Sequence, residues 1–372
     1  MNKKLFILSS IFLLLKLYSK SSTSSRELIQ PLINIQSQGK GNKEAIEAWP
    51  KISQLPPSAI PELLSAMNHA NNLGDNWIRA ALNKICEQNI KKIPTKEIVN
   101  FLKDHSNQGD ARHMAFQIIQ SYQSLKAKKL IPTFIDDPAP VLRREAVEMV
   151  LDQARKTEKE EVKIKLYRKA LHKAREVDQI KEASNQLEEA GQEINLTRLM
   201  GFLMNWHTIG PFDNTERKGF SVDYSPESNG DLNRKHEGAD GIISWKEFSS
   251  SDELGLLDIN QQYGEMKEVC AYAQTTFNSK TEQPAHFRIG SKNAWKMWVN
   301  GKLLFARDEY HRGKTRIDQF IIEGKLQKGE NQILLKICQN EQTQSWTKQW
   351  EFNFRITDPS GSAIHSSNLI SK

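Results

Sequence analysis

The residues of this sequence best suited to contact a ligand are aromatic and polar side chains in its C-terminal half. Some lie in or beside a run of alternating apolar residues, and others lie in the segments between such runs. Aromatic rings stack on the apolar faces of sugars, while neighbouring polar groups hydrogen-bond with the sugar hydroxyls. The candidate ligand-binding residues are Trp298, Asn300, Tyr310, His311, Arg312 and Trp346.

A structural role is the alternative for the tryptophans. Trp298 alternates out of phase with Trp295 and Val299, so one face of its strand would carry an exposed ring. Alternatively, Trp298, Trp346 and Trp350 fill the core of a sandwich or cover its edge. The sequence leaves both interpretations open.

The motifs of common hydrolases and metalloenzymes are missing from the sequence. The histidines of the C-terminal half are scattered, with no His-x-His or His-Glu-x-x-His spacing. The sequence contains no Gly-x-Ser-x-Gly, no phosphate-binding loop and no pair of carboxylates placed for glycoside hydrolysis. We therefore expect no catalytic residue, no metal site and no cofactor. A structural Ca²⁺ held by loop carboxylates is the one alternative.

The elements that position the candidate residues are predicted strands. Trp295, Met297 and Val299 alternate with polar or outward positions, which predicts a half-buried strand. Asn300 and Gly301 follow, and both tolerate the positive φ of a type I′ hairpin turn. Further strands are predicted at Trp206–Phe212, Glu268–Ser279, Pro284–Ser291, Ile333–Ile337 and Trp350–Thr357, with a long polar loop at Thr215–Gly241. This pattern predicts an antiparallel β-sandwich over 205–361.

Residues 43–204 have the pattern of paired helices. Arg79, Arg112 and Arg143 recur at spacings of 33 and 31 residues, each within an amphipathic segment. Three residues after them come Leu82, Ala115 and Ala146. The last of these units resembles a HEAT repeat, with Asp137, Leu142, Arg143 and Ala146 in the order that the family pattern requires. The resemblance implies a helical solenoid, a fold that usually binds partner proteins.

The C-terminal half resembles the galactose-binding-like jelly roll. The resemblance rests on Trp298-Val-Asn-Gly-Lys302, on the loop with Tyr310, His311 and Arg312, and on Leu326-Gln-Lys-Gly-Glu-Asn331. This sandwich occurs as the sugar-binding domain of family 2 glycoside hydrolases. It also occurs beside HEAT repeats in secreted proteins of planctomycete-type bacteria. The same sandwich serves sugar-binding, protein-binding and structural roles, so the resemblance is informative mainly about the fold.

The N-terminus predicts export. Lys3 and Lys4 precede the apolar run Leu5–Leu15, which fits a signal peptide and is short for a membrane span. An uncleaved N-terminal anchor is the alternative. Removal of residues 1–24 takes away four lysines and lowers the formal net charge from +7 to +3, which argues against nucleic acid as a partner. The three cysteines, Cys86, Cys270 and Cys338, make no disulfide framework, and the last two are expected as buried thiols or as a pair.

These observations predict a multi-domain chain, α-helical first and then all-β. The expected parts are a signal peptide (1–24), a linker (25–42), a HEAT-like α-solenoid (43–204), a galactose-binding-like β-sandwich or jelly roll (205–361) and a mobile tail (362–372). We expect a secreted or cell-envelope protein without catalytic activity that binds carbohydrate or an envelope protein. The alternatives are a carbohydrate-active enzyme or its accessory subunit, and a protein-interaction solenoid with a structural β cap.

Overall fold

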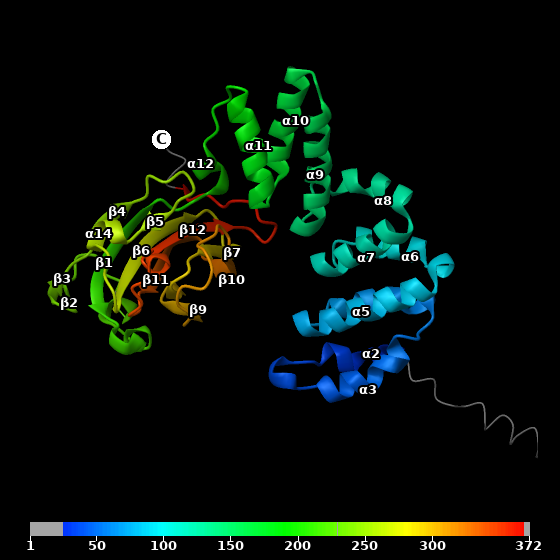
Figure 1. The fold of residues 1–372 in the computed structure, drawn as a ribbon, viewed down its shortest axis with the longest axis horizontal. Coiled ribbons are helices and arrows are strands. Elements are labelled where there is room, and N and C mark those ends of the chain that lie inside the picture. Colours follow the sequence, from blue (N-terminus) through cyan, green and yellow to red (C-terminus); the bar gives the residue numbers. More distant parts are fainter. Residues whose placement is uncertain (1–24, 229, 368–372) are drawn as a thin grey trace, which may run out of the picture. The chain divides into compact units, whose positions relative to one another are not determined.

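A computed structural model describes residues 25–228 and 230–367, so the expected signal peptide lies outside the described residues. The chain is helical first and then folds as antiparallel sheets (Figure 1). It divides into two compact units between Met149 and Val150, within one helix. No helix in the described ranges has the length and apolar character that crossing a membrane requires.

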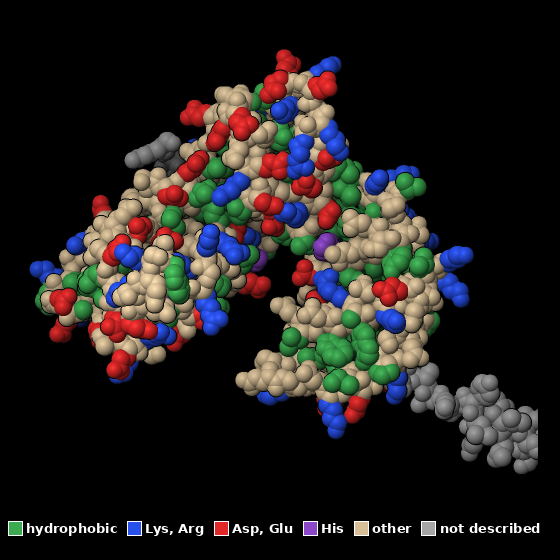
Figure 2. All heavy atoms as spheres, in the orientation of Figure 1, with side chains coloured by type: hydrophobic (Ala, Val, Ile, Leu, Met, Phe, Trp, Pro, Cys, Tyr) green, Lys and Arg blue, Asp and Glu red, His purple; other side chains and the backbone are tan. Residues whose placement is uncertain are grey.

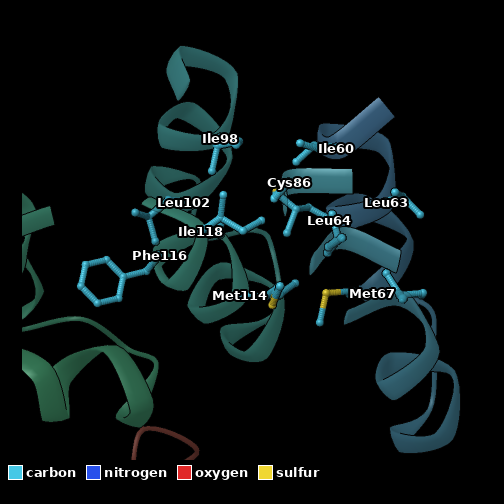
Figure 3. Close-up of a cluster of buried hydrophobic side chains, with 14 of the residues drawn as sticks. Ile60, Leu63, Leu64, Met67, Cys86, Ile98, Leu102, Met114, Phe116 and Ile118 are labelled. Carbon is cyan, nitrogen blue, oxygen red and sulfur yellow. The ribbon is translucent and has the colours of Figure 1, made fainter. Parts of the chain in front are cut away.

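The first unit is built from helices that pack in sequential pairs. Its helices are α2 (Ser25–Ile33), α3 (Asn42–Ile52), α4 (Ile60–Met67), α5 (Asn72–Gln88), α6 (Thr95–Lys103), α7 (Gly109–Tyr122), α8 (Ser124–Leu130) and the start of α9 (Pro140–Lys156). The apolar faces share one buried core, and Figure 3 shows Leu64, Leu102 and Met114 among its side chains. The helices approach closely where side chains are small: a Cβ on Gly74 would lie 2.5 Å from the Leu32 carbonyl oxygen.

The recurring arginines join neighbouring helix pairs. Arg112, which is 1% exposed, donates two hydrogen bonds to Asp137 (2.8 and 2.6 Å) and one to the Leu102 carbonyl (2.8 Å). Arg79 donates to the Asp110 carbonyl (3.2 Å), and Arg143 donates to the Asp137 carbonyl (2.8 Å). A buried charge needs such partners, so the recurrence in the sequence marks contacts within and between repeats.

The second unit holds a helical hairpin and the sandwich. The helices before the sandwich are the end of α9, α10 (Glu160–Lys173), α11 (Val177–Glu189) and α12 (Leu196–Met200), and a further short helix, α14 (Asn260–Tyr263), lies within the sandwich. A six-stranded sheet has the order β4-β1-β6-β11-β8-β9, and a four-stranded sheet has the order β10-β7-β12-β5. The bounds are β1 Asn205–Asp213, β4 Lys246–Ser249, β5 Leu257–Asp258, β6 Val269–Ser279, β7 Gln283–Gly290, β8 Ala294–Val299, β9 Lys302–Arg307, β10 Phe320–Leu326, β11 Gly329–Cys338 and β12 Glu351–Thr357.

Alternation along the strands creates two separate cores. On β6, Ala271 and Ala273 face the core between the sheets, whereas Cys270 and Tyr272 face a second core on the outer side of the six-stranded sheet. The predicted long loop covers that outer core. It forms a short helix, α13 (Ser225–Ser228), and a hairpin of β2 (His236–Gly238) and β3 (Gly241–Ile243).

Two boundaries differ from the sequence-based prediction. The change from helix to strand falls at Asn205 as predicted, but α10, α11 and α12 belong to the same compact unit as the sandwich. The first part of the predicted mobile tail is packed on the sandwich. Ile364 donates to the Ile356 carbonyl (2.9 Å), and Asn278 donates to the Ser366 hydroxyl (3.0 Å). Main-chain pairing, which the composition of the tail does not reveal, holds this segment.

Candidate functional site

The candidate residues fall into two groups at opposite ends of β8. Asn300 follows the last residue of the strand, and Trp298 lies one residue before its end. Tyr310, His311, Arg312 and Trp346 lie in loops at the other end, where β6 and β8 begin and β11 ends. The six residues of β8 separate the two ends by about 17 Å at a rise of about 3.3 Å per residue. One small ligand therefore does not contact both groups.

The contacts of Trp298 and Asn300 support the fold: Trp298 packs in a core, and Asn300 forms a turn. Trp298 is 6% exposed and packs in the outer core, with Tyr272 at a ring-centroid distance of 6.5 Å. Asn300 and Gly301 form the predicted turn, with φ of 52° and 77°. The Asn300 amide accepts from the Gln332 backbone (2.9 Å) and donates to Asn331 (3.0 Å). For Trp298, this burial favours the core role that the sequence left open.

The exposed ring of the candidate set is Trp346, at 53% exposure. It lies in a short 3-10 turn, Ser345–Thr347, whose carbonyls are held by two lysines. Lys292 donates to the Trp346 carbonyl (2.6 Å), and Lys267 donates to the Thr347 carbonyl (2.8 Å). Burial lowers the pKa of both lysines from the ordinary value. Because the main chain of the turn is fixed, the ring is presented on a rigid support.

The side chain of His311 packs against the ring of Trp346. The two rings make an edge-to-face contact at 6.3 Å, and His311 is buried. Its Nε2 lies 2.9 Å from the Asn340 amide oxygen. Burial lowers the pKa of His311, and the Asn340 hydrogen bond opposes that effect. The imidazole of His311 is therefore neutral at pH 7. Because the amide oxygen of Asn340 can only accept a hydrogen bond, the proton of the neutral ring lies on Nε2.

Charged and aromatic groups lie beside this pair. Arg217 forms a bidentate ion pair with Glu341, and its guanidinium carbon lies 5.4 Å from the centre of the Tyr310 ring. The hydrogen bonds from Arg217 lower the pKa of Glu341 to about 2. Asn214, which is fully buried, donates to the Tyr310 hydroxyl (3.2 Å) and to the Gln339 carbonyl (2.8 Å). We call the exposed surface formed by Trp346, Arg312, Arg217 and Glu341 the loop-end site.

Sequence reasoning did not find Asn214, Arg217, Lys292 or Glu341. They come from three segments that the fold brings together, and no spacing pattern links them. A second missed feature is a buried ionic network under the long loop. The Lys336 ammonium donates to Glu227 (2.9 Å) and to the Val222 carbonyl (2.7 Å), and Glu227 also accepts from the Tyr272 hydroxyl. Neither charge of that network reaches solvent appreciably, so we assign it to stability.

Other cavities and clusters lie away from the candidate residues. A cavity of about 650 Å³ lies between α12 and residues 364–366, and none of the candidate residues lines it. Over the described part of the chain, no group of three or more His, Cys, Asp or Glu side chains is placed to hold a metal ion. The chain matches no protein-family model and no curated protein.

Proposed function

We propose that this chain is a secreted or cell-envelope protein that binds carbohydrate without catalysis, and that the loop-end site is where it binds. The observation that carries the proposal is Trp346, an exposed ring on a hydrogen-bonded turn, packed on His311, with the Arg217–Glu341 ion pair in the neighbouring loops. A ring of this kind covers the apolar face of a sugar, while Arg217, Glu341 and Arg312 provide donors and acceptors for its hydroxyls.

The resemblances of the two halves support the same proposal. The galactose-binding-like sandwich occurs as the sugar-binding domain of family 2 glycoside hydrolases and in many secreted proteins, which often join it to HEAT repeats. The face drawn in Figure 2 mixes Lys and Arg with Asp and Glu, without a field of one sign, as expected for a neutral ligand. The proposed binding requires no cofactor, and an envelope protein is the alternative partner.

A glycan array with the full chain tests the proposal. We expect Trp346→Ala to weaken binding of the retained glycan about fivefold or more, since stacking of one aromatic ring contributes on the order of 1 kcal/mol or more. Leu303→Ala is the matched control, because Leu303 is also an exposed apolar residue (47%) but lies on β9. It is expected to leave binding unchanged.

Three outcomes would contradict the proposal. Glycan binding that survives Trp346→Ala unchanged would remove the loop-end site as its location. An array without any retained glycan, together with capture of an envelope protein by residues 43–204, would favour the interaction solenoid. Hydrolysis of a polysaccharide panel by the full chain would favour the enzyme alternative.

A further inference from the structure

Two of the cysteines lie directly opposite each other in the six-stranded sheet. Cys270 on β6 is the register partner of Cys338 on β11, and their sulfur atoms are 2.8 Å apart. Both side chains are fully buried in the outer core. The third cysteine, Cys86, lies in the helical unit and is also buried. The chain thus has one adjacent pair of cysteines and one isolated thiol, Cys86, which is an internal reference when thiols are counted.

The register places the pair where a cross-strand bond is sterically allowed. The Gln339 amide donates to the Val269 carbonyl (2.8 Å), so the two strands are still hydrogen-bonded at the position next to the cysteines. In an antiparallel ladder, residues directly opposite each other have Cα atoms about 4.5–5.5 Å apart. This separation falls within the range of about 4.4–6.8 Å that disulfides span.

We infer that Cys270 and Cys338 are a site of oxidative modification and form a disulfide between β6 and β11, with a small-molecule disulfide such as oxidised glutathione as the co-reactant. One cysteine thiolate attacks a glutathione sulfur, which forms a mixed disulfide and releases one glutathione thiolate. The second cysteine thiolate then attacks the protein sulfur of that mixed disulfide and releases the other. Two thiol protons pass to the two glutathione molecules, so the protein loses two electrons and glutathione gains them.

Burial determines when this bond forms. Burial and the neighbouring Cys270 raise the pKa of Cys338 well above its ordinary value, so the folded chain holds little thiolate there. Neither sulfur is open to a bulky reagent in the folded chain. Oxidation therefore belongs to the folding stage, before the long loop covers the outer core. Once formed, the bond is protected from reductants by the same burial.

The bond would also hold the strand ends beneath the loop-end site. Cys338 directly precedes Gln339 and Asn340, and these two residues contact Asn214 and His311. The Glu268 amide, two residues before Cys270, donates to the Asn340 carbonyl (3.2 Å). The inference itself does not rest on sugar binding, since it depends only on the register and on the two thiols.

Thiol counting on the full chain tests the inference. The protein is unfolded under reducing conditions, refolded in a buffer of reduced and oxidised glutathione, and alkylated in denaturant. We expect one alkylated cysteine of the three, Cys86, and a mass lower by two hydrogens than that of the reduced chain. The oxidised form is expected to melt about 10 °C higher than the reduced form, because the bond closes a long loop.

Two variants give the controls. Cys86→Ala is expected to leave no alkylated cysteine after refolding, and it keeps both members of the pair. Cys270→Ala is expected to leave two alkylated cysteines and to abolish the effect of oxidation on the melting temperature. Three alkylated cysteines in refolded wild-type protein would overturn the inference, and so would a disulfide that contains Cys86. The number of alkylated cysteines in the wild-type protein tests the inference even if Cys270→Ala fails to fold.

Discussion

The Lys336 side chain has no solvent contact, so the stability of the fold depends on a complete set of partners for its ammonium group. Its ammonium donates to two carbonyl oxygens and to Glu227, and it lies 5.0 Å from the centre of the Tyr224 ring. Removal of one member of such a set leaves the other charge buried and unpaired, which costs far more than the pair itself contributes.

We predict that Lys336→Met lowers the free energy of unfolding by about 3–5 kcal/mol, because Glu227 is left buried without its cation. Urea denaturation followed by tryptophan fluorescence measures the loss. The double variant Lys336→Met with Glu227→Gln is expected to be more stable than the single variant, since it removes the unpaired charge.

Lys325 provides the matched control for this prediction. It pairs with Glu282, and both side chains are about 60% exposed. We expect Lys325→Met to change the free energy of unfolding by at most about 1 kcal/mol, as for other exposed ion pairs. Equal losses for Lys325→Met and Lys336→Met would show that Lys336 is not buried as the structure has it.

At the scale of elements, a single carboxylate lies between two arginines whose like charges would otherwise destabilise the pairing of β7 with β12. Arg288 on β7 and Arg355 on β12 are direct register partners. Asp318, in the loop before β10, accepts from Arg288 Nη1 (2.7 Å) and from Arg355 Nε (2.7 Å), and both guanidinium groups are buried. Like charges directly opposite each other destabilise a sheet unless an anion lies between them.

The pKa of Asp318 gives this arrangement a pH dependence. Burial would raise that pKa, but the hydrogen bonds and charges of Arg355 and Arg288 outweigh burial and hold it below its ordinary value. A carboxyl whose pKa is lowered by folding stabilises the fold above its unfolded pKa of about 3.9, and that contribution is lost as the pH falls through the folded pKa.

We therefore predict that Asp318→Asn lowers the free energy of unfolding by about 3 kcal/mol at pH 7, where the two guanidinium groups lose their anion. The difference from wild type is expected to shrink as the pH falls below about 4. Urea titrations at pH 7 and near pH 3 measure both values. A difference that is the same at the two pH values would contradict the proposed role of the ionised carboxylate.

Periodicity in the sequence predicts the strands better than it predicts the site. Alternation correctly separates the face of Trp295, in the core between the sheets, from that of Trp298. Whether the outer face is open or covered depends on the long loop, whose path no periodic pattern encodes. The contact of His311 with Trp346 joins two loops that are 35 residues apart, so only the tertiary fold reveals it.

At the scale of the whole molecule, residues just before Asn205 extend the sandwich core. Phe202 and Leu203 are 4% and 8% exposed, and Leu203 donates to the Phe354 carbonyl (3.0 Å). The Met200 carbonyl, at the end of α12, accepts from Arg355 (3.2 Å). Farther upstream, Arg175 donates to the Ser362 hydroxyl (3.0 Å). The hairpin of α10 and α11, with α12, is therefore part of what stabilises the sheets.

These contacts predict different stabilities for two fragments of the second unit. A fragment of residues 157–372 keeps α10, α11 and α12, whereas a fragment of residues 205–372 loses Phe202, Leu203 and the Met200 carbonyl. Burial of one large apolar side chain stabilises by about 1.5–3 kcal/mol, so the longer fragment is expected to be more stable by roughly 3–6 kcal/mol. Urea midpoints, followed by tryptophan fluorescence, measure the difference. Equal midpoints would show that the sandwich is a self-sufficient domain that begins at Asn205. A higher midpoint for the longer fragment would place the boundary of the folding unit upstream of Asn205, where Phe202, Leu203 and the end of α12 still pack against the sheets.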